Sequence, residues 1–136
     1  MSIRHEGNNA PTVRPAAVRE WTTWAGVALI LLLGLIHAVD APDNFSEAAY
    51  KGLLFVAIGL GAALAAFGIY RGQSWGWHLG ALVAVGAFVG YVISRTVGLP
   101  GLGVDDAWFE PLGVLSIITE ALFVGLYWLT HATRDT

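Results

Sequence analysis

At 136 residues the chain has room for one domain, and with 56% hydrophobic but only 12% charged residues it lacks the charged surface of a soluble domain, which is about 25% charged. The formal net charge of −3, without a basic patch, argues against nucleic acid as a partner. The lack of cysteine excludes disulfides, thiolate chemistry and Cys-ligated metal sites.

Four apolar segments are long enough to cross a bilayer, which takes roughly 20 residues for about 30 Å of hydrocarbon. They are residues 21–39, 50–70, 75–94 and a last segment from 108 or 111 to 130. Short connections between them imply antiparallel neighbours, and tryptophan and tyrosine near their ends suit the headgroup level. The sequence therefore predicts an all-α, membrane-spanning antiparallel four-helix bundle at 21–131, with cytoplasmic tails at 1–20 and 132–136.

The distribution of positive charge predicts the orientation. Five arginines precede the first segment, lie between the second and third, or follow the fourth: Arg4, Arg14, Arg19, Arg71 and Arg134. The other side holds only Lys51 and Arg95. We therefore expect a multi-pass protein of a prokaryotic plasma membrane with both termini in the cytoplasm. A cleaved signal peptide is the alternative, although its apolar stretch would be long and Asp40 suits a cleavage site poorly.

The first segment carries a histidine and a carboxylate on one helix face. His37 precedes Asp40 by one turn, so the carboxylate could fix the imidazole tautomer and raise its basicity. The topology brings Glu47, Arg95 and Glu110 to the same outer end of the bundle. We expect a metal or cation site there with His37, Glu47 and Glu110 as ligands, and Arg95 as a structural bridge between carboxylates. Glu110 followed by proline is equally explained as a helix start.

Small residues in the second and third segments predict the surfaces where the helices pack. Two faces carry them: Ala57, Gly61, Ala65 and Gly68 in the second segment, and Gly80, Ala84 and Ala87 with Tyr91 in the third. The glycines at 86 and 90 point to another face of the third helix. That spacing suits contact with a second copy or a larger membrane complex.

The fourth segment places a carboxylate near the bilayer midplane. Glu120 lies about 15 Å past Pro111 along a helix, where a charged side chain costs about 2.5–3.5 kcal/mol on insertion scales. The polar or small residues on its face are Gly113, Ser116, Tyr127 and His131. We expect Glu120, together with Asp40, to bind an ion or relay a proton. The alternative is a hydrogen-bonded carboxyl that only holds helices together.

The remaining histidines have simpler explanations. His78 falls at the cytoplasmic end of the third segment among tryptophans, and His131 lies where a partial positive charge suits a helix C-terminus. His37 and His78 belong to opposite leaflets, which argues against one haem bound by both in a single protomer.

The first connection resembles that of a known family. Residues 37–47 fit the pattern His-x-x-x-Ala-Pro-x-x-Phe-x-Glu, and they are followed by Ser-Arg-Thr-Val-Gly-Leu-Pro at 94–100 and by Glu-Pro at 110. Over about residues 30–125 the chain is similar to a family of small four-helix membrane proteins of bacteria and archaea. The resemblance implies that His37, Glu47, Arg95, Glu110 and Glu120 are the matched polar positions, and it brings no activity with it. The connection at 102–109 differs from the family's, so the resemblance assigns no role to its two aspartates.

Two functions follow from these residues. In the first, the outer ends of the helices form a polar pocket that binds or moves a cation, a metal ion or a proton. In the second, the protein is an accessory subunit whose polar groups lock helices and contact a partner. A lipid-modifying enzyme with His37 as its base is a third and weaker hypothesis.

Overall fold

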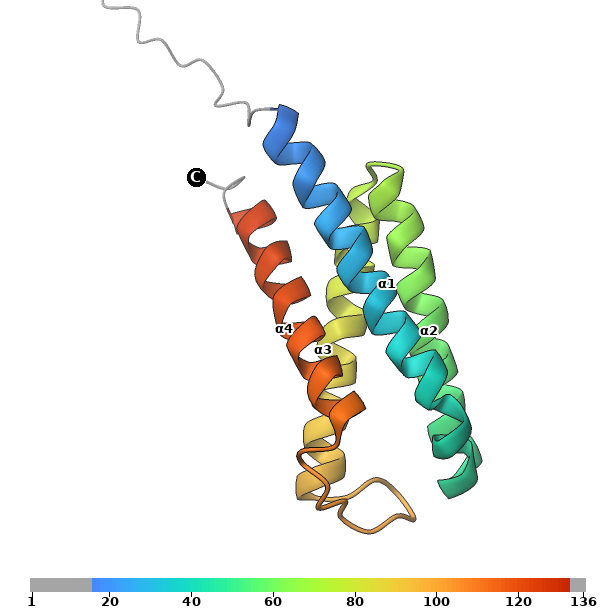
Figure 1. Cartoon of the computed structure of the whole chain (residues 1–136). Coiled ribbons are helices and arrows are strands. Elements are labelled where there is room, and N and C mark those ends of the chain that lie inside the picture. The colour runs from blue at the N-terminus through green and yellow to red at the C-terminus, as the bar shows by residue number, and fades with distance from the viewer. Residues whose placement is uncertain (1–15, 133–136) are drawn as a thin grey trace, which may run out of the picture.

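The protein is a bundle of four long α-helices. A computed structural model describes residues 16–132, and within this range the chain forms α1 (Ala16–Glu47), α2 (Ala49–Tyr70), α3 (Ser74–Thr96) and α4 (Pro111–His131), without strands. Consecutive helices run antiparallel (Figure 1). All four are long and apolar enough to cross a membrane. The predicted all-α four-helix bundle is confirmed, and its helices are those of a multi-pass membrane protein.

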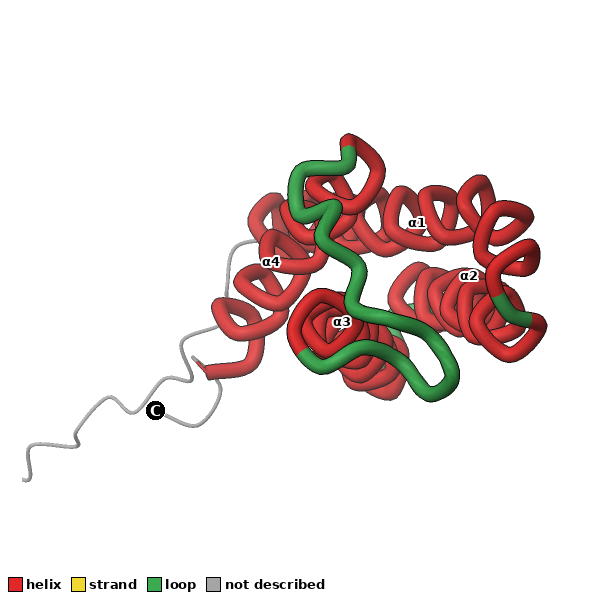
Figure 2. The backbone as a smooth tube through the Cα atoms, turned by 90° about the horizontal axis from the view of Figure 1, so that it is seen from below, coloured by secondary structure: helices red, strands yellow, loops and turns green. Residues whose placement is uncertain are grey.

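The two ends of the bundle differ in their connections. At one end, which we name the turn end, residues 71–73 join α2 to α3, and α1 begins and α4 ends there. At the other end, the loop end, only Ala48 separates α1 from α2, and residues 97–110 join α3 to α4. Seen from below, this loop 97–110 crosses the end of α3 on its way to α4 (Figure 2).

The first helix is longer than the sequence indicates. It begins at Ala16 rather than at residue 21, and it continues through Pro42 to Glu47. Hydropathy marks where the apolar stretch ends and does not mark where the backbone stops being helical. In the polar part the side chain of Asn44 donates to the carbonyl of Asp40 at 2.7 Å and that of Ser46 to the carbonyl of Asp43 at 2.6 Å. The rest of the predicted tails, residues 1–15 and 133–136, lies outside the described residues.

The apolar core extends from the middle of the bundle toward the turn end. Its buried members come from all four helices: Ile30, Leu33, Ala62, Ala65, Ala66, Ile69, Ala84 and Phe123. Alanine and glycine dominate α2 and α3 here because close backbone approach is what drives helix association in lipid. The backbones of α2 and α3 approach closely at Gly68 and Gly76, where a Cβ added to Gly76 would lie 2.6 Å from the carbonyl carbon of Gly68.

The predicted packing faces are confirmed for α3 and only partly for α2. Gly80, Ala84 and Ala87 are buried as expected. In α2, Ala57 is exposed, whereas Ala62 and Ala66 are buried. The reason is that α2 packs against both α1 and α3, so its buried surface is wider than a single stripe.

The glycines proposed for a homodimer face open space. A Cβ added to Gly86 or to Gly90 would meet nothing within 4 Å. Gly86 is exposed, but Gly90 borders a cavity inside the protein. The homodimer stays a prediction.

Candidate functional site

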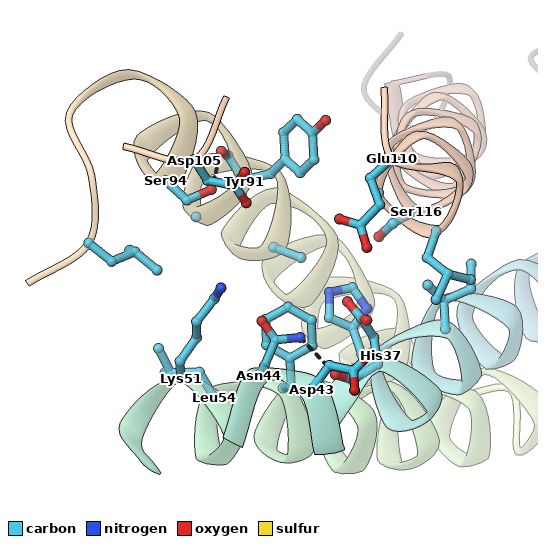
Figure 3. A pocket seen from close by; sticks show the side chains of 18 of the residues that line it. His37, Asp43, Asn44, Lys51, Leu54, Tyr91, Ser94, Asp105, Glu110 and Ser116 are labelled. Carbon is cyan, nitrogen blue, oxygen red and sulfur yellow. Dashed lines mark hydrogen bonds between the residues drawn. The ribbon is translucent and has the colours of Figure 1, made fainter. Parts of the chain in front are cut away.

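A cavity of about 150 Å³ lies among the loop-end halves of the four helices. The six predicted site residues all line it: His37, Asp40, Glu47, Arg95, Glu110 and Glu120. Figure 3 shows His37, Asn44 and Lys51 on one side of this pocket, facing Ser94, Asp105 and Glu110 on the other. The pocket reaches the surface through side chains that are about half exposed, such as Glu47 and Glu110.

Glu120 occupies the deep part of the pocket. It lies nine residues into α4, about 14 Å from the first residue of the helix, and is only 2% exposed. The hydroxyl of Ser116, one turn earlier, donates to its Oε1 at 2.6 Å. Its Oε2 is buried and has no hydrogen-bond partner. A buried carboxylate oxygen without a donor is costly, so this atom calls for a partner that the described side chains do not supply.

His37 lies on α1 and is 6% exposed. Its Nδ1 is 2.9 Å from the carbonyl oxygen of Leu33, and because a carbonyl only accepts, Nδ1 carries the proton. In the neutral ring Nε2 is therefore the acceptor. Asp40 does not fix the tautomer as the sequence suggested, since the backbone one turn before His37 provides the partner instead. The ring also packs on Phe55, with 5.1 Å between ring centroids.

Arg95 ties the loop 97–110 to α3. Its guanidinium is 3.5 Å from the carboxylate of Asp105 and 3.6 Å from that of Glu110, and it donates to the carbonyl of Ala107 at 3.2 Å. The cation also lies 3.8 Å from the ring centroid of Tyr91. The hydroxyl of Tyr91 donates to the carbonyl of Trp108 at 2.6 Å. Arg95 does contact two carboxylates, but both belong to the loop 97–110 and not to two helices as the sequence suggested, and Asp105 is one to which the resemblance assigns no role.

The predicted metal ligands do not converge. Glu47 ends α1 about 15 Å along the helix from His37, and it pairs with Lys51 one turn away. Glu110 pairs with Arg95. Across residues 16–132 no group of three or more His, Asp or Glu side chains is placed to hold a metal ion. As described, the pocket is thus not a preformed three-ligand metal site.

The charges of the pocket are unbalanced in favour of acids. Its lining contains six carboxylates and two cationic side chains: Asp40, Asp43, Glu47, Asp105, Glu110 and Glu120 against Lys51 and Arg95. Lys51 pairs with Glu47, and Arg95 with Asp105 and Glu110. Among the described residues the carboxylates of Asp40, Asp43 and Glu120 therefore form no ion pair.

Sequence reasoning missed several lining residues. Lys51 could have been found from its spacing, because glutamate four residues before lysine on a helix is a favourable pair. Tyr91 precedes Arg95 by the same spacing, which predicts stacking of the guanidinium on the ring. Nothing local indicates Ser94 and Asn44, which line the pocket because of how the helices cross.

The turn end holds a smaller polar cluster. Nδ1 of His78 and the hydroxyl of Tyr127 share a hydrogen bond of 2.8 Å that joins α3 to α4. The ring of His131 lies 4.5 Å from that of Tyr127 and 5.4 Å from that of His78. His78, Tyr127 and His131 thus form one cluster, which the separate interpretations of the histidines as an interfacial residue and a helix cap did not anticipate.

Comparisons with known proteins add no assignment. Searches of protein-family models, of curated proteins and of solved structures find no match to this chain.

Proposed function

We propose that the protein binds a cation in the loop-end pocket and that Glu120 supplies the neutralising charge. The observation that carries this proposal is the almost complete burial of Glu120 with Oε2 unpartnered, at the bottom of a cavity. Ionisable groups at this depth are expensive in a membrane and mark ion or proton sites.

The lone pairs in the pocket favour a cation over an anion. The deep acceptors are Oε2 of Glu120 and Nε2 of His37, and both offer electron pairs rather than protons. The two cationic side chains are engaged by carboxylates nearer the surface. A cavity of about 150 Å³ has room for a small cation with a few waters, given about 30 Å³ for each water.

Carbodiimide labelling of the purified protein in detergent or liposomes tests this function. Dicyclohexylcarbodiimide reacts with a protonated carboxyl in an apolar site, so we expect Glu120 to be modified and the modification to speed up as the pH falls. If Na⁺, K⁺, Ca²⁺ or Zn²⁺ is the ligand, that ion slows labelling at constant pH. If only acidification changes the rate, the bound cation is the proton.

Two variants complete this experiment. Glu120→Gln removes the reactive carboxyl and should abolish the mass shift on the α4 peptide, whereas Glu110→Gln, at the pocket mouth, should leave it in place. Absence of labelling at Glu120, or a labelling rate that neither pH nor any of the four ions changes, would count against cation binding.

We further infer that the pocket opens to the outside and that the turn end faces the cytoplasm. Arg19 and Arg71 lie at the turn end, and the sequence adds arginines beyond both described termini. Among residues 16–132 the cationic side chains at the opposite end are Lys51 and Arg95, and each is paired with an acid. This asymmetry agrees with the excess of positive charge in cytoplasmic segments.

Cysteine labelling tests the orientation, because the chain contains no cysteine of its own. Asp106 in the loop 97–110 and Gln73 in the turn are both exposed. An impermeant maleimide added to intact cells should label Asp106→Cys, and it should label Gln73→Cys only after permeabilisation. The reverse pattern would place the pocket on the cytoplasmic side.

A further inference from the structure

The inward face of α4 connects the pocket to the polar cluster at the turn end. The buried or half-buried side chains that follow one another on this face are Ser116, Glu120, Phe123, Tyr127 and His131. Their spacing of three and four residues keeps them on one side of the helix. Two apolar side chains, the buried Phe123 and the half-buried Val124, lie between Glu120 and Tyr127.

The ring of Phe123 fills the space between the two polar regions. It is 0% exposed and stacks on Trp77 of α3, with 5.7 Å between centroids and 24° between planes. Gly80 makes room for it, since a Cβ there would lie 2.5 Å from Cζ of the ring. Ile30 and Leu33 of α1 belong to the same buried layer. A glycine thus admits an aromatic ring at the one level where the polar face of α4 is interrupted.

Beyond this ring the polar groups reach the surface again. The hydrogen-bonded pair of Tyr127 and His78 lies one turn further along α4, and His78 is exposed. His131 stacks on Tyr127 from the same helix, and Arg19 and Glu20 of α1 line a groove with Trp77 at this end. On the pocket side, the ionisable groups that line the cavity with Glu120 come from α1, from α2 and from α3 with its loop: His37, Asp40, Asp43, Glu47, Lys51, Tyr91, Arg95, Asp105 and Glu110.

We propose that the pair of Tyr127 and His78 is a second proton-binding site and that Phe123 is the barrier between it and Glu120. The inference rests on the proposed cation site and takes the proton to be the cation that Glu120 binds. A proton leaves the carboxyl of Glu120, passes through water to the Tyr127–His78 pair, and leaves a carboxylate that is reprotonated from the pocket. The transfer is a net movement of one proton and needs no co-reactant.

Passage is closed in the described conformation. Glu120 and Tyr127 are seven residues apart, about 10 Å along the helix axis, which no hydrogen bond spans. The intervening layer is apolar, and a charge does not cross such a layer without water. A water chain forms only when the Phe123 ring leaves its place above Gly80, so the ring controls the rate of transfer.

Proton flux into liposomes tests the inference. The full chain is reconstituted with a trapped pH-sensitive dye, and a K⁺ gradient with valinomycin sets the membrane potential. We expect Phe123→Ala to raise the proton flux about tenfold or more over the wild type, a factor that corresponds to a barrier lower by about 1.4 kcal/mol. Should this variant fold poorly, Phe123→Leu, which keeps most of the core volume, should give a smaller increase in the same direction.

Second-site variants separate a proton pathway from a general leak. Both variants are made in the Phe123→Ala background. Glu120→Gln should return the proton flux to the wild-type level, and Tyr127→Phe should lower the flux of Phe123→Ala several-fold. Leu126→Ala, which removes a buried side chain from the next turn, is the matched control and should leave the flux unchanged.

Three results would overturn the inference: no increase in flux with either Phe123 variant, an increase that persists without the Glu120 carboxyl, or an equal increase with Leu126→Ala. The cation site is judged separately, because Glu120 can still be labelled and protected in a protein that conducts no protons.

Discussion

Replacing Gly76 with alanine is expected to force α2 and α3 apart and to lower the free energy of unfolding by about 3 kcal/mol, the upper part of the range for overpacking. The added Cβ would overlap the amide nitrogen of Ile69 and lie 2.6 Å from the carbonyl carbon and 2.8 Å from the Cα of Gly68. All of these atoms belong to the backbone, so no side-chain rotation relieves the contact. The two helices have to separate along their length.

A matched control lies on the same helix. Gly86 is exposed and a Cβ there meets nothing within 4 Å, so Gly86→Ala should be neutral or should stabilise the protein by up to about 1 kcal/mol through helix propensity. Unfolding in mixed micelles, with dodecyl sulfate as denaturant and circular dichroism as the signal, compares the two variants. If the free energy of unfolding of Gly76→Ala lies within about 0.5 kcal/mol of the wild-type value, the described close approach of α2 to α3 is wrong.

The second large effect is expected for Arg95→Met, which should release the loop 97–110 from α3 and lower the free energy of unfolding by about 2 kcal/mol. Hydrogen bonds to charged groups contribute about 1.5–3 kcal/mol. We expect a value in the lower part of this range, because the side chains of Asp105 and Glu110 are 35% and 45% exposed and remain hydrated when the cation is lost. The amide of Asp105, which donates to the carbonyl of Ser94 at 2.9 Å, should lose its protection against hydrogen exchange.

Arg95→Lys separates the charge of this residue from its shape. Lysine keeps the cation but lacks the planar fork that reaches two carboxylates and a carbonyl at once, so protection should be only partly restored. Exchange at residues 49–70 of α2 serves as the internal reference, since this helix does not contact Arg95 through any hydrogen bond or ion pair of the described residues. Unchanged protection of Asp105 in Arg95→Met would show that the loop is held by other contacts.

The sequence predicts the number and direction of the helices because both follow from local composition. Apolar stretches of about 20 residues and their aromatic ends are properties of contiguous residues, and the structure places helices on all of them. The end of α1 is the exception. Residues 40–47 are polar and contain Pro42, which argues for a loop, yet hydrogen bonds from Asn44 and Ser46 to the preceding turn accompany a continuing helix.

The sequence predicts which residues line the candidate site, but it does not predict which of their side chains contact one another. Topology alone brings residues from the same end of four helices together, which is why the six predicted residues share one pocket. Partners depend on helix rotation and tilt, and these follow from packing between segments distant in the chain. For this reason the hydrogen bond between His78 of α3 and Tyr127 of α4 could not be anticipated.

The junction at Ala48 determines how the pocket can change its width. With a single residue between them, α1 and α2 form one stiff hairpin, and the Arg95 network fastens the loop 97–110 to make α3 and α4 a second. The two hairpins are in close backbone contact at Gly68 and Gly76, beside the turn at residues 71–73. We therefore expect any widening of the pocket to be a pivot of one hairpin against the other about this point, with the largest displacement at the loop end. Such a tilt would widen the pocket mouth while the layer around Phe123, nearer the pivot, moves little.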